Sequence, residues 1–402
     1  MSNIHAALEI GTSRTVLAIG EADSGGRLKV TCHAEIQSSG IRKSQILDIN
    51  QAKQSISSVL HMIEKKHDES GSKIILSNAV LAVSGQHIKS DPFFGTVQVE
   101  NSRVDTTEIN EVMRSAHAMT LPKDRELLDI VDQDYVLDNL GGITAPRGMA
   151  GRILKLNTMQ IHADRNRIQD ARTAAEAAHL EISEPIYAIT CAADAVLEDY
   201  ERKNGVLVID LGGGSTGYAV YSDGYPVSTG VLGIGGDHIT NDIAHAFQTT
   251  NAQAEDLKVH EAHALLSTSG NLSARVKVER GENPLMDNRT ISRQALNMVV
   301  NARVLETFTV IRETLEDQDL LHRLHAGVVL TGGGAQLQDI KALAEQALGM
   351  SVRLGNPIHV DGFENEDFPP AYATIAGALI YASRNFDESS ILNSIFGRFF
   401  GK

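Results

Sequence analysis

Two segments of the chain share one pattern, in which a turn of small residues separates two apolar runs rich in β-branched side chains. "AALEIGTSRTVLAIG" occupies residues 6–20, and "VLVIDLGGGSTGYAV" occupies residues 206–220. Each reads as a strand, an acidic residue, glycine, a hydroxyl residue and a second strand. Continuous apolar runs bounded by glycine are typical of buried strands. The repeat of this unit predicts two related α/β lobes that face one another.

The remaining pattern predicts further elements around these units. Residues 6–36 indicate three strands, with a hairpin turn at "DSGG" (23–26). The spacing of apolar residues predicts a helix at 48–70, and a buried strand follows at 78–85. Further along, we expect a loop that enters a helix at 233–247, and polar helices from there to about residue 325. The last predicted elements are a strand–glycine turn–helix unit at 325–348 and a final core helix at 372–385.

The stretch 86–162 differs from its surroundings. It is rich in charges and turns, and it alternates strands with a helix near 107–119. We expect it to form a separate small α+β insert. The Ala-rich segment that follows, 164–180, predicts a helix capped by Asp164.

Composition narrows the class of protein. With 402 residues, 42% of them hydrophobic, more than one core is expected. The net charge of −15 argues against nucleic acid as a partner, because that binding rests on Lys and Arg. The two cysteines, Cys32 and Cys191, lie far apart, which favours a reducing cytoplasm. We see neither a signal peptide nor an apolar run of the roughly 18–20 residues that span a bilayer, so export and a transmembrane helix are not expected.

The glycine turns have the chemistry of a phosphate site. Glycine lets a ligand approach the backbone closely, and successive N–H groups form an anion-binding concavity. We therefore expect the two lobes to hold a phosphate chain between them, through Gly11, Thr12, Ser13, Gly212, Gly213, Gly214 and Ser215. A third turn, made by Gly332, Gly333 and Gly334, could let a flat nucleoside pack against the backbone.

An acidic residue ends the first strand of each unit, Glu9 in one and Asp210 in the other. Phosphate ligands usually carry Mg²⁺, which takes one or two carboxylates and keeps several waters. We expect Glu9 and Asp210 to hold Mg²⁺ through water and to be the catalytic candidates. One glycine turn by itself could equally be a simple tight turn. The pattern is neither a G-x-G-x-x-G helix entry nor a P-loop.

The end of the chain predicts an amphipathic helix. Its six apolar residues recur at i, i+1, i+4, i+5, i+8 and i+9 and are Ile391, Leu392, Ile395, Phe396, Phe399 and Phe400. Two cations, Arg398 and Lys402, lie off this apolar stripe. Partial burial of six such side chains suffices for reversible attachment to a lipid surface. The alternative is a helix that docks on its own core or on a sister chain.

Two histidine pairs have the i,i+3 spacing that metal ligands on a helix can adopt, His260 with His263 and His322 with His325. No third ligand is evident for either pair, so solvated or packed histidines are the better reading.

The three glycine turns in this order resemble those of the actin-like ATPase superfamily, and five segments narrow the resemblance to the FtsA family of bacterial cell-division proteins. These are "LEIGTSRTVLAIGE" (8–21), "AVSGQHI" (82–88), "TNDIAHAF" (240–247), "AEDLKVHEAHA" (254–264) and "GVVLTGGGAQLQDI" (327–340). The resemblance covers essentially the whole chain. It implies an actin-like α/β fold, a ribonuclease H-like unit duplicated in two lobes, with the extra subdomain 1C of the FtsA family.

The family's subdomains map onto this sequence as follows. Subdomain 1A takes 1–85, 163–205 and 357–385, 1C takes 86–162, 2A takes 206–237 and 326–356, 2B takes 238–325, and a short linker with the membrane-targeting helix takes 386–402.

The resemblance also implies a function. Members of the family bind ATP between the lobes, polymerise as actin does, and hold the FtsZ ring on the inner face of the cytoplasmic membrane at the septum. The implied partners are the FtsZ C-terminal peptide through 2B, further copies of the chain, membrane lipids, and downstream divisome proteins through 1C. The loop glycines Gly235 and Gly236 would join the phosphate site, and Glu255 and Lys258 would contact the ribose and base. From spacing alone, Glu255 and Lys258 would read as a surface pair on a helix.

One departure from the family bears on hydrolysis. The second loop usually reads Asp-x-Gly-Gly-Gly-Thr-x-Asp, whereas here Ser215 replaces the Thr and Gly217 the second acid. We therefore expect ATP to bind and hydrolysis to be slow or absent. Asp194 lies where related ATPases carry a water-positioning residue, but a helix-surface acid is the plainer reading. The alternatives are a pilus-assembly platform resembling PilM and a metabolite kinase of the same superfamily.

Overall fold

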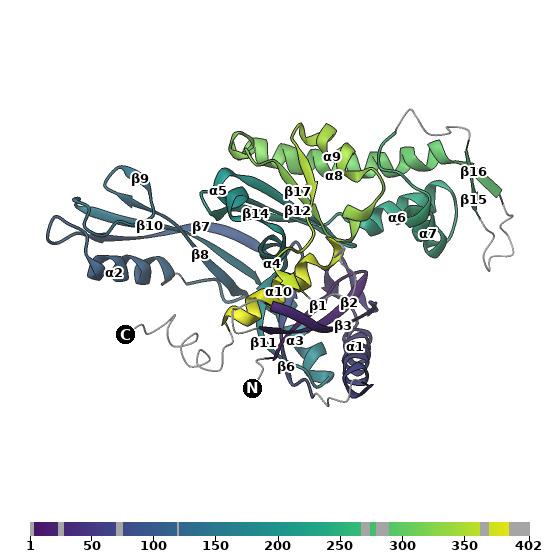
Figure 1. Cartoon of the computed structure of the whole chain (residues 1–402), viewed down its shortest axis with the longest axis horizontal. Helices are drawn as coiled ribbons and strands as arrows, with labels where there is room; N and C mark the ends of the chain where they lie inside the picture. The colour runs from purple at the N-terminus through teal and green to yellow at the C-terminus, as the bar shows by residue number, and fades with distance from the viewer. Residues whose placement is uncertain are drawn as a thin grey trace.

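The computed structural model describes residues 4–22, 28–69, 75–118, 120–266, 274–278, 289–361 and 370–385. The chain forms two α/β lobes and a separate insert that extends to one side of them (Figure 1). No helix in the described ranges is long and apolar enough to cross a membrane. The predicted turn at 23–26 and the predicted helix within 386–402 lie outside these ranges.

A six-stranded sheet forms the centre of the first lobe. Its order is β11–β6–β1–β2–β3–β19, and the bounds of these strands are Glu181–Tyr187, Asn78–Val83, Ile4–Ile10, Arg14–Ala22, Leu28–Gln37 and Val360–Asp361. The first three strands in the sequence pair antiparallel, and β6 then joins β1 in parallel. A small hairpin, β4 (Ile41–Arg42) with β5 (Gln45–Ile46), follows β3.

The second lobe repeats this arrangement. Its sheet has the order β14–β13–β12–β17–β18, with bounds Tyr225–Leu232, Thr216–Ser222, Val206–Leu211, Val328–Thr331 and Val352–Leu354. Again the first three strands pair antiparallel, and β17 and then β18 add in parallel. The order β3–β2–β1–β6–β11 of the first lobe is thus matched strand for strand. The duplication predicted from the two glycine units is confirmed.

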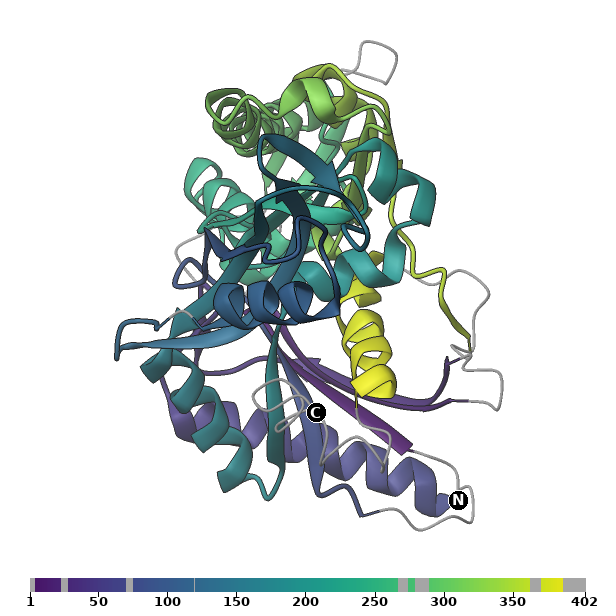
Figure 2. The same ribbon diagram turned by 90° about the vertical axis from the view of Figure 1, so that its left-hand side faces the viewer.

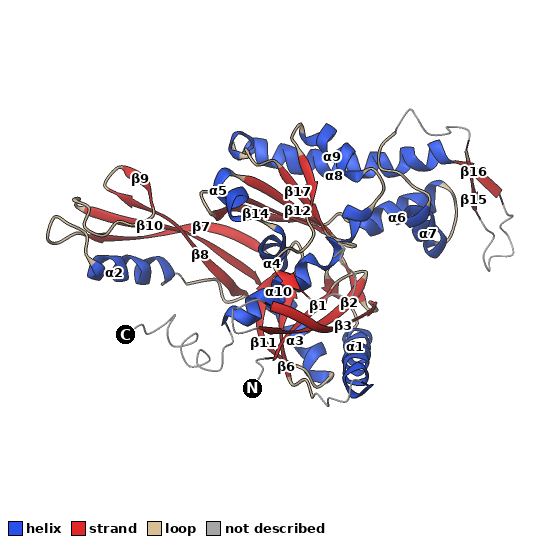
Figure 3. Cartoon of the chain, in the orientation of Figure 1, coloured by secondary structure: helices blue, strands red, loops and turns tan. Residues whose placement is uncertain are grey.

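Helices cover both sheets (Figure 3). In the first lobe α1 (Ile49–Glu69) and α3 (Arg165–Ala177) pack together outside the sheet. On the other side, α4 (Ala188–Val196) and α10 (Ala373–Asn385) lie against each other and against strands of the first sheet. Buried residues of α4, α10 and both sheets belong to one continuous apolar core. The lobes therefore share their packing along this seam.

The closest helix contact in this seam depends on a missing side chain. Gly377 of α10 faces the backbone of Cys191 in α4, and a Cβ at Gly377 would overlap the Cys191 carbonyl group. The seven buried residues of the nine-residue α4 include four alanines, so both backbones can approach closely. Small residues thus set the spacing of the two helices between the lobes.

The outer face of the second lobe has its own apolar core, built around Phe308 of the long helix α8. The helices of this lobe are α5 (Asp199–Asn204), α6 (Gly236–Ala246), α7 (Asn251–His260), α8 (Arg293–Asp317) and α9 (Ile340–Leu348). Short 3₁₀ turns occur at Leu321–Arg323, Gly333–Gln336 and Pro370–Tyr372.

The insert is a four-stranded sheet with one helix and a third core of its own. The strand order is β7–β10–β8–β9, with bounds Lys89–Gln98, Ile153–Asp164, Arg125–Leu137 and Leu140–Ile143, and the helix is α2, Thr106–His117. Gly95 of β7 lies directly beneath the backbone of α2, where a side chain would not fit. Figure 1 shows the insert extending away from both lobes, and in Figure 2 it projects toward the viewer.

Most of the predicted elements appear close to their expected bounds. The helix predicted at 48–70 is α1, and its apolar stripe of Ile56, Val59, Leu60 and Ile63 is buried. Asp164 caps α3, because its carboxylate accepts from the N–H groups of Asn166 and Arg167. The prediction of helices alone up to residue 325 was wrong. A strand pair, β15 (Arg275–Val278) with β16 (Arg289–Ser292), precedes α8, and its apolar residues complete the outer core.

Candidate functional site

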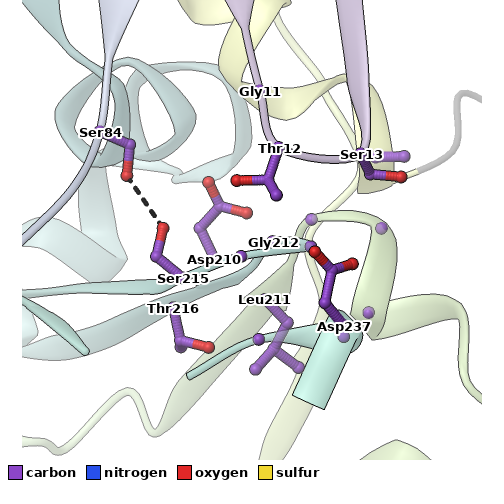
Figure 4. Close-up of a pocket in the computed structure, with 18 of the residues that line it drawn as sticks. Gly11, Thr12, Ser13, Ser84, Asp210, Leu211, Gly212, Ser215, Thr216 and Asp237 are labelled. Atoms are coloured by element: carbon purple, nitrogen blue, oxygen red, sulfur yellow. Dashed lines mark hydrogen bonds between the residues drawn. The ribbon is translucent and has the colours of Figure 1, made fainter. Parts of the chain in front are cut away.

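A cavity of about 350 Å³ lies between the two lobes, within the size range of small-molecule sites. All three glycine turns line it, together with the start of α6 and one face of α7. Segments more than 300 residues apart in the chain therefore meet around one space. Figure 4 shows the labelled side chains at this meeting point.

The first turn joins β1 to β2. The amide of Gly11 donates to the Arg14 carbonyl at 3.0 Å, and a Cβ at Gly11 would lie 2.8 Å from the same oxygen. Glycine is thus required for the tightness of this turn. The turn places Thr12 and Ser13 in the cavity wall, on the opposite side of the cleft from Gly212 (Figure 4).

The second turn joins β12 to β13 and meets the first turn across the cleft. The amide of Gly212 donates to the Ser215 carbonyl at 3.1 Å. A Cβ at Gly213 would lie 2.9 Å from the Ser13 Cβ, and one at Gly214 would overlap Thr12. The absence of side chains at 213 and 214 is what allows the lobes to approach so closely here.

The third turn follows β17, which pairs in parallel with β12 so that Asp210 lies opposite Thr331. Gly332 adopts a φ of +84°, and a Cβ there would collide with Asp210 and lie 2.7 Å from the Leu211 carbonyl oxygen. A side chain is excluded at Gly334 as well, because a Cβ there would lie 2.8 Å from the Cβ of Leu211. At Gly333 no atom of the described residues lies within 4 Å of the Cβ position. The third turn therefore packs directly on the end of the second.

Glu9 and Asp210, the two carboxylates expected to hold Mg²⁺, both line the cavity. Burial is the main reason that the pKa of Glu9 is raised to about 7; the charge of Arg14 opposes the rise, and the charges of Asp210 and Glu35 contribute to it. Burial also raises the pKa of Asp210, whose carboxylate accepts from the Thr374 hydroxyl at 3.1 Å. Each carboxylate is thus held in surroundings that penalise its charge.

These two groups fit a hard cation. The Oε2 atom of Glu9 is enclosed and has no hydrogen-bond partner among the described residues. Two carboxylates, one of them with an unsatisfied oxygen, are a suitable set for Mg²⁺ that also keeps water and phosphate oxygens as ligands. A bound Mg²⁺ would neutralise the carboxylates and the phosphates together. Within the described ranges no three His, Cys, Asp or Glu side chains gather as metal ligands do, so water and phosphate oxygens would complete the shell around these two carboxylates.

Gly235, Gly236, Glu255 and Lys258 lie together at another part of the cavity wall. The ammonium group of Lys258 donates to Glu255 Oε2 at 2.6 Å, to the Gly236 carbonyl at 3.2 Å and to the Thr240 hydroxyl at 2.9 Å. These bonds tie α7 to the first turn of α6. Glu255 and Lys258 are therefore part of the cavity wall and not a pair on a solvated helix surface.

Sequence reasoning missed several residues of the wall, among them Ser44, Ser84, Asp237 and Thr374. Asp237 was detectable, because an acid in the first helical turn after "GIGG" points toward the same space as the glycines. Burial raises the pKa of Asp237, and Lys258 opposes that rise. Ser44 and Ser84 carry no signal of their own, since single serines are common in loops.

Other candidates lie outside the cavity wall. Asp194 forms an ion pair with Arg202 at 2.8 Å on α4. His263 pairs with Asp339 at 2.8 Å, and His260 and His322 lie near Asp256 and Asp319. The predicted membrane-binding residues between 391 and 402 belong to the part of the chain that the structure does not describe.

Models of two protein families match the sequence. "Cell division protein FtsA" matches residues 207–377, which include the second and third glycine turns. "SHS2 domain inserted in FTSA" matches residues 85–162, which form the insert.

Curated relatives match nearly the whole chain. Cell division protein FtsA of Pseudomonas aeruginosa is 34% identical over 375 residues, which are 93% of this chain and 88% of that protein. The FtsA proteins of Escherichia coli and Bacillus subtilis are 29% and 28% identical, over 94% and 96% of this chain and 90% and 84% of theirs.

Solved structures share the fold at lower identity. A PilM–PilN type IV pilus biogenesis complex contains a chain with a TM-score of 0.65 and 19% identity, covering 94% of this chain and 98% of that one. MreB5 of Spiroplasma citri bound to ADP has a TM-score of 0.56 and 13% identity, with 98% of each chain covered. The same MreB bound to AMPPNP has a TM-score of 0.54 and 13% identity, with 99% of each chain covered. The fold of this chain is therefore the actin-like one.

Proposed function

Since this chain belongs to the FtsA family of actin-like cell-division proteins, we propose that it binds ATP with Mg²⁺ between its lobes and acts at the division septum. The observation that carries this proposal is the meeting of three glycine turns, from both lobes, around one cavity that also holds Glu9 and Asp210. Backbone N–H groups of such turns suit phosphate oxygens. The phosphate-binding residues are those predicted, from Gly11 to Ser13 and from Gly212 to Ser215.

The nucleoside would lie toward α6 and α7. Glu255 and Lys258 border this part of the cavity, and Gly332 to Gly334 line it with backbone that carries no side chains. The hydrogen bonds of Lys258 to the first turn of α6 hold this wall in place before any ligand arrives. Preorganisation of this kind lowers the entropic cost of binding.

Hydrolysis is proposed to be slow or absent. The carboxylates of the cavity wall are those of Glu9, Asp210, Asp237 and Glu255. At position 217, where the family's second loop usually carries an acid, a Cβ would already lie 3.3 Å from Ile189. Phosphate release at about 1 per second or faster, the low end of ordinary enzyme turnover, would contradict this part of the proposal. A metabolite kinase would in addition need an acid facing its substrate.

We further propose that the nucleotide-bound chain assembles into filaments on the inner face of the cytoplasmic membrane and tethers the FtsZ ring there. The family relationship supports this role, and the apolar stripe and two cations between residues 391 and 402 support attachment to lipid. FtsZ would bind through its C-terminal peptide, at residues 238–325, and downstream divisome proteins at the insert.

Electron microscopy of the full chain on a lipid monolayer tests this role. With ATP and Mg²⁺ we expect filaments on the lipid. A variant that lacks residues 389–402 should bind nucleotide as before but leave the monolayer bare, and it should no longer pellet with liposomes. A truncated chain that still pellets would refute the lipid contact, and a chain that reaches the membrane only with a peptide partner would favour the pilus-platform alternative.

A further inference from the structure

Three serine hydroxyls from three separate loops meet at one end of the cavity. Ser215 belongs to the second glycine turn and is buried. Its hydroxyl lies 2.9 Å from that of Ser44 and 3.4 Å from that of Ser84, and all three residues line the cavity. Figure 4 shows the contact between Ser84 and Ser215.

Ser44 is brought there by a strained turn. The hairpin of β4 and β5 turns through Lys43 and Ser44, which have φ values of +50° and +57°. Positive φ at both central residues is the type I′ arrangement, for which Asn and Gly are preferred. Strain of this kind usually persists where the surroundings hold it in place for a function.

The surroundings of this turn are the phosphate loops themselves. The backbone N–H of Ser44 donates to the Thr12 hydroxyl at 2.8 Å. The Lys43 backbone lies so near Gly214 that a Cβ on the glycine would be 3.0 Å from the Lys43 Cα. The tip of the hairpin therefore contacts the first turn through Thr12 and the second through Gly214 and Ser215.

The three serines lie at the end of the cavity away from the proposed nucleoside. Lys258 contacts Gly236, and Asp237 follows it, so Asp237 marks the nucleoside side. In Figure 4, Asp237 and the Ser84–Ser215 pair lie on opposite sides of Gly212 and Asp210. A phosphate chain that starts near Asp237 and crosses the glycine turns would end at these serines.

Hydroxyls suit this position. Each can donate one hydrogen bond and accept two. Three hydroxyls joined by two contacts keep one proton that neither contact uses, and rotation can present it to an arriving phosphate oxygen. Hydrogen bonds from neutral donors to a charged oxygen are stronger than those between neutral groups.

We propose that Ser44 and Ser84, together with Ser215, bind the terminal phosphate of a nucleoside triphosphate and so determine the preference of the protein for ATP over ADP. This inference rests on the proposed nucleotide site and adds two residues that lie outside its three glycine turns.

Isothermal titration calorimetry of the full chain with Mg²⁺, with AMPPNP and ADP as the two probes, tests the inference. The variants are S44A, S84A and the double variant, and S58A is the control, because Ser58 lies on α1, outside the cavity lining, and its hydroxyl donates to the Gln54 carbonyl one helical turn before it. We expect S44A and S84A each to weaken AMPPNP binding on the order of tenfold and to leave ADP binding unchanged. Ser84→Thr, which keeps the hydroxyl, should restore most of the AMPPNP affinity.

The outcomes separate this inference from the proposed function. If the unaltered chain binds neither nucleotide, both fall. If it binds nucleotide but S44A and S84A lose AMPPNP and ADP affinity equally, or lose neither, only the inference is overturned. Melting midpoints measured without nucleotide identify a variant that fails to fold, and in that case the other single variant and Ser84→Thr decide.

Discussion

Gly332 lies directly against the carboxylate of Asp210, and a side chain at 332 would occupy the position of Asp210 Oδ1. The two residues come from neighbouring parallel strands, β17 and β12. The third glycine turn, which borders the proposed nucleoside site, therefore packs directly against Asp210, one of the two carboxylates proposed to hold Mg²⁺.

Gly332→Ala should displace Asp210 and weaken nucleotide binding. The substitution adds a collision to the strain of the backbone, because the φ of +84° and ψ of 170° at Gly332 lie in a region that essentially only glycine adopts. Gly349→Ala is the control for strain without a collision: Gly349 lies in the left-handed helical region, which costs other residues about 1–2 kcal/mol, and no atom of the described residues lies within 4 Å of its Cβ position. We expect denaturant unfolding to show a loss of about 1 kcal/mol for the control and at least twice that for Gly332→Ala. Equal losses would mean that Asp210 moves aside freely.

Glu9→Gln should make the ligand-free protein more stable at pH 8 and hardly change it at pH 5. Burial raises the pKa of Glu9 from 4.5 to about 7, so the folded state holds the extra proton between these values. Stability from this group therefore falls as the pH rises through that window, by about 3 kcal/mol in total, and the neutral glutamine avoids that loss.

Urea unfolding at both pH values measures the effect, and Glu69→Gln, an exposed carboxylate of α1, is the control. The same Glu9 variant should lose Mg²⁺-dependent nucleotide affinity. A pH-independent gain in stability would show that the carboxylate of Glu9 is not the titrating group.

Lys258→Met should weaken nucleotide binding about tenfold while lowering the melting midpoint only slightly. The ammonium group supports the wall through Gly236 and Thr240, and only 14% of the side chain is exposed. Lys341→Met removes an exposed ion pair with Glu345 on α9 and should change neither quantity. Unchanged affinity for Lys258→Met would exclude α7 from the site.

Arg353 and Glu201 should respond unequally to truncation. Arg353 bonds the Glu201 carboxylate at 2.6 Å and the Val196 carbonyl at 2.7 Å, where the chain crosses between the lobes. Glu201 is almost fully buried, whereas 37% of the Arg353 side chain is exposed. Arg353→Ala strands a buried carboxylate and should cost about 3–5 kcal/mol. Glu201→Ala should cost less, because the freed guanidinium group can reach water.

Unfolding of both single variants and the double variant measures the asymmetry as a thermodynamic cycle. A double variant less stable than Arg353→Ala would contradict this account, since removing Glu201 as well takes away the stranded charge.

The two-lobed fold and the glycine turns of the cavity wall could be predicted from the sequence because their signals are local. The turns at 11–13 and 212–215 each carry the strand, acid and glycine pattern within a few residues, and the turn at 332–334 follows a strand directly with three glycines. Ser44 and Ser84 could not be found this way, because only the tertiary fold brings them to Ser215. The pair of β15 and β16 was missed for a related reason: four-residue strands leave too short a pattern to distinguish from polar loops.

The insert rests on a lobe to which it is not directly joined in sequence. It leaves the first lobe after β6, yet Ser90 donates to the Thr229 carbonyl and Gln133 to the Pro226 carbonyl, both on β14 of the second lobe. Its strand β8 has 13 residues, about 40 Å at the usual rise of a strand. A rotation of the lobes by about 5° would thus move the far end of the insert by about 3 Å if the insert followed one lobe. In that case a small change in the angle between the lobes would produce a larger displacement at the far end of the insert.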